Sequence, residues 1–274
     1  MEKITKNNLI YFKFPHIDLL HCFTTKHGGA STGVAASMNV DKSKEPRENV
    51  HKNFTILGQA LGFEPASLIG LSQTHTARVE IVNDSHMGNK IHKSDIFGGC
   101  DGMVTNDPEL TLLTMHADCL ALYFYDPIHQ IIGLSHAGWR GTVGSIAGET
   151  IKKMGELGSK PENILAGISP GIGFCCFQVD YPVVIEFENN FIWADEYIVT
   201  DNELYHDQAR GTGYRKYKID LVGVNKRVML EHGILDKNIH AQEICTKCNH
   251  DLFHSHRVTG KDRGNMGAIL SLKK

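Results

Sequence analysis

Apolar residues recur along this chain in two patterns, a helical spacing and short continuous runs of strand length. The helical spacing predicts helices over residues 46–62, 143–154, 182–188 and 221–232. Thr142 is the expected cap of the second helix, and Gly233 is expected to end the last one. The short apolar runs predict strands over residues 67–73, 79–82, 103–105, 110–115, 120–125, 131–135, 164–168, 241–245, 252–255 and 266–272.

The order of these elements predicts a mixed α/β fold with mixed sheets and helices packed outside them. Strands and helices alternate with short glycine-containing connections. Neither an internal repeat nor a Pro-rich or Gly/Ser-rich linker divides the chain. We therefore expect one domain over residues 1–274.

Composition narrows the classes of function. The formal net charge is −3 without a long run of one sign, which argues against a nucleic-acid-binding surface but leaves room for small anions. No run approaches the ~20 apolar residues that span a bilayer, and residues 1–14 lack the features of a signal peptide. The seven cysteines are an odd number, and sixteen histidines raise the prior for a metal site. A cytoplasmic protein with thiols as core residues, ligands or nucleophiles is expected.

Three polar interruptions stand out among the apolar runs, at residues 73–75, 116–119 and 136–141. Each lies at the end of a predicted strand or between two of them, where α/β folds gather functional side chains. Two histidines and one cysteine are a suitable donor set for Zn²⁺, and three protein ligands leave a coordination position open. Spacing alone favours the other interpretation, a buried cysteine and two ordinary histidines, because the three residues lie far apart in the sequence.

The segment over residues 136–142 adds a candidate anion site. Gly138 and Gly141 allow a tight turn and a close approach of the backbone to a ligand. The helix that follows presents free N–H groups, and Arg140 can supply a bidentate clamp. We hypothesise that Arg140 and the backbone after Gly138 bind an anion; the alternative is a turn with Arg140 on the surface.

A second candidate metal cluster combines Cys245 and Cys248 with His250, His254 and His256. The signal is weak, because one CxxC lacks the second pair that a zinc finger needs. His254 and His256 alternate on a predicted strand. For the pair Cys175–Cys176 we expect buried thiols, since a disulfide between neighbouring residues is strained.

At these residues the chain resembles the laccase-like family of polyphenol oxidases and purine nucleoside phosphorylases. The resembling blocks follow one another in family order over nearly the whole chain, and those at 117–119 and 136–141 are the most specific. The blocks are residues 24–29, 37–39, 73–75, 101–105, 117–119, 136–141, 167–173, 175–177, 245–246 and 255–257.

The resemblance implies an α/β/β/α four-layer sandwich and a zinc ion held by His75, Cys119 and His136, with copper as the alternative metal. It implies phosphorolysis of adenosine, inosine and methylthioadenosine, with adenosine deamination at the same site. The partners would be purine nucleosides and phosphate; no oligomeric state follows. Asn39 and Gln73, together with Arg140, become candidates for substrate binding.

Four positions depart from the family pattern. His116 stands where an aromatic residue is common, Lys26 where Arg is usual, Thr76 where Gly follows the histidine, and Asn265 where Arg is usual. The metal ligands are intact, so these departures bear on anion contacts and substrate preference.

Asp118 is the candidate for acid/base or hydrogen-bonding work in catalysis, with Arg140 as its partner in the site. Asp118 could equally orient a zinc-bound histidine.

Three rival interpretations remain open. The first is a copper oxidase of phenols, against which only one HxH motif, at residues 254–256, is present. The second is a metal-free hydrolase with Cys119 as nucleophile and His136 or His75 as base. The third is a zinc-stabilised interaction module without catalysis.

Overall fold

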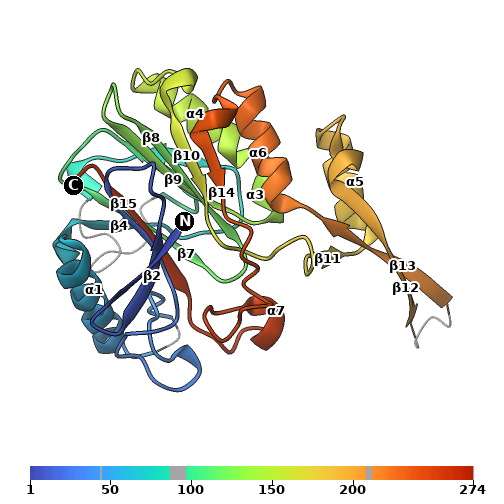
Figure 1. The fold of residues 1–274 in the computed structure, drawn as a ribbon, viewed down its shortest axis with the longest axis horizontal. Coiled ribbons are helices and arrows are strands. Elements are labelled where there is room, and N and C mark those ends of the chain that lie inside the picture. Colours follow the sequence, from blue (N-terminus) through green and yellow to red (C-terminus); the bar gives the residue numbers. More distant parts are fainter. Residues whose placement is uncertain (44, 87–96, 208–211, 274) are drawn as a thin grey trace.

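Two six-stranded mixed sheets lie face to face, and helices cover their outer faces (Figure 1). This computed structural model describes residues 1–43, 45–86, 97–207 and 212–273. The arrangement confirms the expected mixed α/β class and its four layers. Within the described residues, no helix is both long enough and apolar enough to cross a bilayer.

The first sheet has the order β1-β2-β3-β15-β7-β4, and only its β4–β7 pair is parallel. Although β15 is the last strand in the sequence, it lies between β3 and β7 in the middle of the sheet. The bounds of these strands are Glu2–Lys6 (β1), Leu9–Lys13 (β2), Leu20–Thr24 (β3), Leu68–Gly70 (β4), Thr111–His116 (β7) and Met266–Ser271 (β15).

The second sheet has the order β14-β10-β8-β9-β6-β5 and carries the polar segments singled out in the sequence. Its two outermost pairs, β10–β14 and β5–β6, are parallel, and the others are antiparallel. The bounds are Val79–Ile81 (β5), Gly102–Thr105 (β6), Leu120–Asp126 (β8), Ile131–Ala137 (β9), Leu165–Ile168 (β10) and Ile239–Ala241 (β14).

The central strand β8 is apolar throughout because both of its faces are buried. Leu122 and Phe124 pack in the core beneath helices α4 (Ile146–Glu156) and α6 (Leu221–Glu231). Tyr123 and Tyr125 alternate with them and belong to the core between the two sheets. A sheet covered on both sides explains the short continuous apolar runs of the sequence.

Helix α1, Arg47–Leu61, covers the outer face of the first sheet. Its Val50, Phe54 and Leu57 are buried there, as the helical spacing predicts. Gly62 ends the helix with φ of 92°, a conformation that glycine adopts without strain.

A third sheet, β11-β13-β12, forms an arm that projects from the body beside helix α5 (Figure 1). No strand was expected here, because residues 198–219 mix charged and polar residues without an apolar run. The bounds are Gln178–Val179 (β11), Tyr181–Asn190 (α5), Ile198–Asp207 (β12) and Thr212–Ile219 (β13). The strands β1, β2 and β3 also lie in a region for which the sequence patterns predicted none.

Four local predictions are wrong. The strand expected over residues 67–73 ends at Gly70, because the chain then turns toward the second sheet. The strands expected over 241–245 and 252–255 are largely loop, followed by the short helix α7, His256–Thr259. Thr142 caps no helix; it lies inside the five-residue helix α3, Trp139–Val143, while Ser145 precedes α4.

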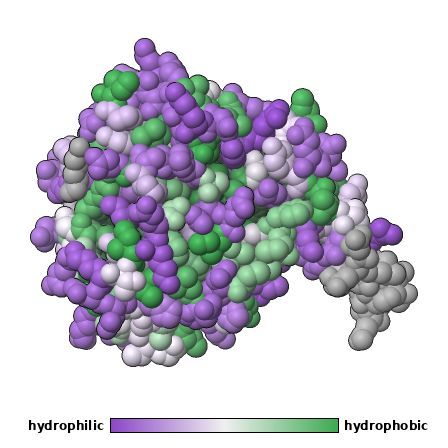
Figure 2. All heavy atoms as spheres, viewed as in Figure 1, coloured by the Kyte–Doolittle hydropathy of each residue, from purple (hydrophilic) through white to green (hydrophobic). Residues whose placement is uncertain are grey.

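Polar residues cover much of the face shown in Figure 2, with apolar residues scattered between them and in small patches. Scattered apolar residues of this kind are normal on a protein surface.

Candidate active site

Three side chains predicted as metal ligands converge from three separate segments. His75 lies in the loop between β4 and β5, Cys119 in the turn between β7 and β8, and His136 on strand β9. Their candidate ligand atoms all lie within 4.8 Å of one another. The two imidazole rings meet edge to face, with centroids 5.0 Å apart.

A buried carboxylate, Asp101, organises this group. Its Oδ1 lies 2.8 Å from Nδ1 of His136 and accepts the backbone N–H of His75 at 3.1 Å. Its Oδ2 accepts the backbone N–H of Thr76 at 2.7 Å and that of Thr74 at 3.2 Å. These bonds hold His75 in a left-handed backbone conformation with φ of 63°. The sequence placed Asp101 in a resembling block but gave it no role.

Gly138 provides the space in which two of the ligands meet. A Cβ atom at this position would lie 3.0 Å from Sγ of Cys119 and 3.1 Å from Cδ2 of His75. The glycine expected to permit a close approach does so, toward the ligand side chains.

The ligands form a charged pair in the absence of metal. Burial alone would raise the pKa of the Cys119 thiol, but the charge of His136 and hydrogen bonds from His136 and His75 lower that pKa to about 6. Burial alone would lower the pKa of His136, but the Cys119 thiolate and the Asp101 carboxylate raise it to about 9. Cys119 is thus available as a thiolate, the form that binds metals and attacks electrophiles.

The donor set fits a metal ion of the zinc type. Two imidazoles and a thiolate are preferred zinc donors, and Asp101 leaves only Nε2 of His136 free to act as a ligand. Copper also accepts these donors. Within the described ranges, the other group of three or more such side chains consists of four cysteines. The histidines of a multinuclear copper centre are therefore not assembled in that part of the chain.

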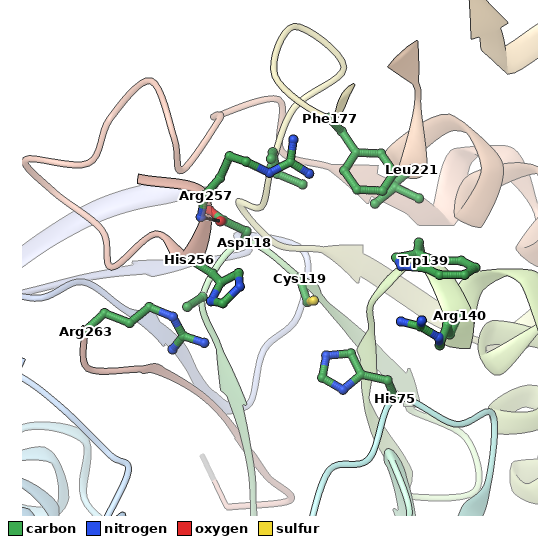
Figure 3. A pocket seen from close by; sticks show the side chains of 12 residues that line it. His75, Asp118, Cys119, Trp139, Arg140, Phe177, Leu221, His256, Arg257 and Arg263 are labelled. Atoms are coloured by element: carbon green, nitrogen blue, oxygen red, sulfur yellow. Dashed lines mark hydrogen bonds between the residues drawn. The ribbon is translucent and has the colours of Figure 1, made fainter. Parts of the chain in front are cut away.

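A cavity of about 330 Å³ opens beside His75 and Cys119 (Figure 3). One wall is apolar and partly aromatic, and the opposite wall is cationic. The apolar wall contains Trp139, Ile172, Phe177 and Leu221. The cationic wall contains His256, Arg257 and Arg263, whereas Arg140 lies against Trp139 on the apolar side.

Of the predicted site residues, Arg140 and Asp118 line this cavity. The Arg140 guanidinium stacks on the ring of Trp139 at 4.2 Å. The Asp118 carboxylate accepts bonds from Thr246 Oγ1 at 2.7 Å, Ser255 Oγ at 3.0 Å and the N–H of Arg257 at 2.7 Å. Asp118 therefore holds the C-terminal loop, and the orientation of a ligand histidine falls to Asp101 instead.

Asn39 and Gln73, the other predicted substrate contacts, are engaged elsewhere. The Gln73 amide pairs with the backbone of Met115 through bonds of 2.8 and 2.7 Å. The fully buried Asn39 side chain bonds to Glu45, to the backbone of Asp41 and to the N–H of Asn265. Neither residue lines the cavity, so the structure does not bring them to the site.

Sequence reasoning missed Arg263, which points into the cavity beside His256 (Figure 3). Its terminal NH1 donates to Asn265 Oδ1 at 2.5 Å and to the carbonyl of Gly264, whereas its buried Nε has no partner among the described protein atoms. Burial lowers the pKa of this guanidinium, as expected for a cation drawn out of water. Arg263 lies two residues before Asn265, the position at which the family usually has an arginine. The chain therefore lacks that arginine but has another one close by.

His116, the departure that precedes the block at residues 117–119, packs as a buried aromatic ring. It packs 5.7 Å from Phe23 and 5.3 Å from His136, measured between ring centroids. Its Nε2 bonds to Thr114 Oγ1 at 2.7 Å, and burial lowers its pKa well below the usual range. A neutral imidazole therefore fills the space of the usual aromatic residue.

The second predicted metal cluster is assembled differently from the expectation. Cys245 and Cys248 meet Cys175 and Cys176, whereas His254 Nε2 bonds to the carbonyl of Met38 at 3.0 Å. Cys175 is exposed and Cys176 half-buried, so the prediction of buried thiols there is wrong.

Comparison with known proteins gives concordant results. The sequence pattern of the family described as "Multi-copper polyphenol oxidoreductase laccase" matches residues 20–273. The chain is 33% identical over 257 residues to "Purine nucleoside phosphorylase YlmD" of Geobacillus stearothermophilus, covering 90% of this chain and 87% of the relative. It is 32% identical to "Purine nucleoside phosphorylase SERP0752" of Staphylococcus epidermidis, with 98% of each covered. The crystal structure of Bacillus licheniformis hypothetical protein YfiH superposes with a TM-score of 0.87 at 29% identity, covering 98% of this chain and 97% of that one.

Proposed function

The chain belongs to the family of multi-copper polyphenol oxidoreductase laccases, and we propose that it is a zinc-dependent purine nucleoside phosphorylase with adenosine deaminase activity. Two relatives that cover most of the chain bear the name purine nucleoside phosphorylase. Adenosine, inosine and methylthioadenosine are the proposed substrates. The seven cysteines are all free thiols, so a reducing cytoplasm is the proposed compartment.

The observation that carries the proposal is the division of the cavity into an apolar and a cationic wall beside the ligand group. A flat apolar ring and an anion must be held at the same time in phosphorolysis of a purine nucleoside. Trp139, Phe177 and Leu221 offer the surface for the ring, because aromatic side chains stack favourably on bases. Arg263 and His256 on the other wall offer donors to phosphate.

Arg263 is the stronger phosphate ligand of the two candidate arginines. Its unpartnered Nε is buried, and a buried donor without an acceptor is costly unless a ligand supplies one. Arg140 stacks on Trp139 at the other wall, where it can contact the nucleoside. The anion site predicted at the start of the helix after Gly138 has less support, because α3, which begins there, has only five residues.

In phosphorolysis, a phosphate oxygen bonds to C1′ of the ribose while the bond from C1′ to the purine nitrogen breaks. The electron pair of that bond goes to the purine, which takes up one proton. Arg263 binds and orients the phosphate, the apolar wall positions the purine and His256 is the proposed proton donor. Asp118 keeps His256 and Arg257 in place through the loop that its carboxylate holds.

His75, Cys119 and His136 would hold the zinc ion, whose contribution when bound is Lewis-acid polarisation of an oxygen, as hydrolytic deamination requires. Asp101 keeps the ligand rings in orientation. Gly138 keeps the space between Cys119 and His75 free of a side chain.

One observation favours a second candidate, a metal-free cysteine hydrolase. Cys119, His136 and Asp101 form a thiolate–imidazole–carboxylate series, and the pKa of Cys119 is lowered to about 6. Alkylation of Cys119 separates the two functions. Zinc blocks the thiol if it is a ligand, and leaves its reactivity unchanged if Cys119 serves only as a nucleophile.

The test is a product assay on zinc-loaded protein given adenosine, inosine or methylthioadenosine, with and without phosphate. Free purine base and the sugar 1-phosphate should form only with phosphate, and inosine should form from adenosine without it. Cys119→Ser protein is the matched control for contaminating activity. Absence of purine products at confirmed zinc content overturns the proposal, and oxygen uptake with a phenol by the copper-loaded protein would point to the oxidase instead.

A further inference from the structure

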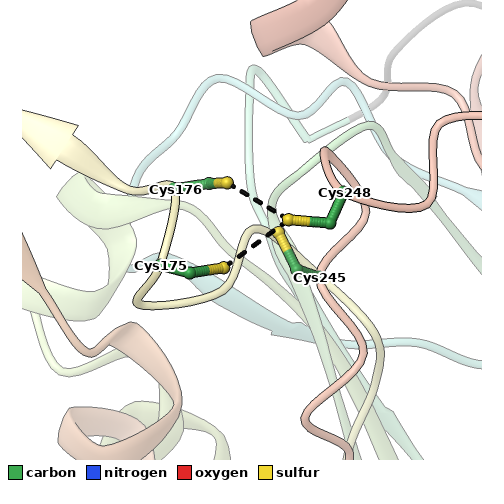
Figure 4. A group of neighbouring side chains, drawn as sticks. All are labelled: Cys175, Cys176, Cys245 and Cys248. Atoms are coloured by element: carbon green, nitrogen blue, oxygen red, sulfur yellow. Dashed lines mark hydrogen bonds between the residues drawn. The ribbon is translucent and has the colours of Figure 1, made fainter.

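Four of the seven cysteines gather at one place outside the active site (Figure 4). Cys175 and Cys176 lie in the loop that follows β10, and Cys245 and Cys248 lie in the loop that follows β14. The four sulfur atoms all lie within 4.8 Å of one another. Cys248 Sγ is 3.8 Å from Cys175 Sγ and 3.4 Å from Cys176 Sγ.

These separations suit sulfur atoms around a common centre. With metal–sulfur bonds of about 2.3 Å, the edges of a tetrahedron of thiolates are about 3.8 Å long. A disulfide would need two of the sulfurs about 2.05 Å apart. The separations of Cys248 from its two neighbours are those of thiols that converge without a covalent bond.

The two loops are built to keep Cys245 at this position. Gly171 pairs with Cys245 in an isolated parallel bridge, and the N–H of Thr246 donates to the Gly171 carbonyl at 2.8 Å. A Cβ on Gly173 would lie 3.0 Å from Cβ of Cys245 and 3.3 Å from Sγ of Cys175. Any side chain at residue 173 would therefore push the two loops apart.

The surroundings also suit a negatively charged thiolate cluster. The backbone N–H groups of Cys248 and Gly173 donate to the Cys245 sulfur. A neighbouring cavity of about 320 Å³ is lined by Cys175 and Cys176, by Lys218, Lys247 and Arg257, and by the carboxylate of Asp201, which pairs with Lys218 at 3.6 Å. The cations outnumber this carboxylate and can offset part of the negative charge of four thiolates around a divalent ion.

We propose that Cys175, Cys176, Cys245 and Cys248 bind a thiophilic divalent cation, with zinc as the expected ion, at a structural site separate from His75, Cys119 and His136. On binding, each thiol gives up its proton to solvent and no electron is transferred. The inference goes beyond the proposed function and does not depend on it.

The position of the site gives it a mechanical role. The first loop carries Ile172 and Phe177 of the apolar wall, and the second leads to His256 and Arg257 of the cationic wall. A metal ion between these loops would therefore clamp the two walls of the active-site cavity at a fixed separation.

Elemental analysis and zinc X-ray absorption on protein purified under reducing conditions test the proposal. Wild-type protein should hold about two zinc ions per chain, whereas Cys248→Ser and His75→Ala should each hold about one. The His75→Ala protein should show a shell of about four sulfurs near 2.3 Å. The control is Cys22→Ala, a buried cysteine outside both clusters, which should keep both ions.

Three results would overturn the proposal. The first is a folded Cys248→Ser protein with the zinc content of wild type. The second is an X-ray absorption spectrum without a four-sulfur shell. The third is a mass of the wild-type protein, measured after purification in reducing buffer, that is lower by two hydrogens for each disulfide. If Cys248→Ser does not fold, the spectrum of the His75→Ala protein decides. Loss of zinc in Cys248→Ser but not in His75→Ala would support the structural site and count against the metal of the proposed function.

Discussion

Asp101 Oδ1 and His136 Nδ1 lie 2.8 Å apart, and the same carboxylate accepts the backbone N–H groups that shape the loop of His75. One buried side chain thus orients two of the three proposed ligands. Because Nδ1 is engaged, the remaining ring nitrogen of His136 is the one directed to Cys119.

Replacing Asp101 with Asn should lower zinc affinity about 10- to 100-fold, the usual effect of removing a carboxylate behind a ligand histidine. The amide of Asn keeps one acceptor oxygen and has an NH2 donor in place of the other, so it loses the bonds either to His136 and His75 or to Thr74 and Thr76. Competition with a coloured chelator measures the affinity. Asp195→Asn, at an exposed position, is the matched control and should bind zinc like wild type. Equal affinity of the two variants would refute the role of Asp101.

The thiol of Cys119 should react at unusually low pH in metal-free protein. Its pKa of about 6 means that the thiolate is present above that value and is lost as pH falls through it. The rate of alkylation, followed at the Cys119 peptide by mass spectrometry, should therefore rise between about pH 5 and 7 and then level off. His136→Ala removes the cation that lowers the pKa, so its alkylation curve should move to higher pH. A wild-type midpoint near 8.5, the usual thiol value, would contradict the charged pair.

A methyl group at position 138 should disturb the ligands directly. In Gly138→Ala the new Cβ would meet Cys119 Sγ at 3.0 Å, so we expect destabilisation of about 1–3 kcal/mol and weaker zinc binding. Gly155→Ala is the control, because nothing lies within 4 Å of its new Cβ. Within α4 that change should raise stability by about 0.4–1 kcal/mol. Urea denaturation and chelator competition measure both, and unchanged zinc affinity in Gly138→Ala would be inconsistent with the close approach.

Arg263→Ala should raise the KM for phosphate about 10- to 100-fold, corresponding to the loss of charged hydrogen bonds worth about 1.5–3 kcal/mol. Arg263→Lys should restore part of the affinity, because it keeps the charge but not the planar donor group. Steady-state kinetics at varied phosphate measures the effect. Arg47→Ala, an exposed arginine on α1, should leave the KM unchanged.

Arg140→Ala tests the alternative that Arg140, and not Arg263, binds phosphate. If Arg140 binds phosphate, its truncation will raise the phosphate KM and Arg263→Ala will not. We expect Arg140→Ala to act mainly on the KM for the nucleoside, since its guanidinium lies over Trp139.

Asp118 should prove a positioning residue. Its carboxylate accepts hydrogen bonds from the hydroxyls of Thr246 and Ser255 and from the N–H of Arg257, so its oxygens are engaged in holding the loop. Asp118→Asn should raise the KM for the nucleoside, and Thr246→Val, which removes one of these bonds and leaves Asp118 in place, should reproduce part of that rise. The pH profile of kcat should keep both limbs in Asp118→Asn; loss of one limb would make Asp118 a proton-transfer group.

Most of the fold could be predicted where a strand or helix buries apolar residues. The strand at 120–125 and the helix at 46–62 are found because their burial imposes continuous or helical patterns. The hairpin of β12 and β13 projects from the body, so its sequence is free of that constraint. The strand expected over 252–255 is absent because Phe253 is buried against Phe12 and Phe23 of the first sheet without its backbone pairing with a strand.

Some residues of the candidate site could likewise be predicted from the sequence, and others could not. His75, Cys119 and His136 interrupt apolar runs, so the sequence marks them, and the structure brings them together. Asp101 and Arg263 act through contacts with residues far away in the sequence, and nothing in their local surroundings distinguishes them from other charged residues. The pairing of Cys175 with Cys248 is likewise a product of tertiary structure, because 73 residues separate them.

The position of β15 sets the order in which the molecule can be completed. Residues 266–271 lie between β3 and β7, so the first sheet remains two separate pieces until they are available. During synthesis, the facing edges of β3 and β7 are open, and open edges are templates for wrong pairing. A chain that ends before Met266 would contain every proposed metal ligand and still be expected to aggregate. Shielding of these edges in the nascent chain is then as important for this protein as the chemistry of its site.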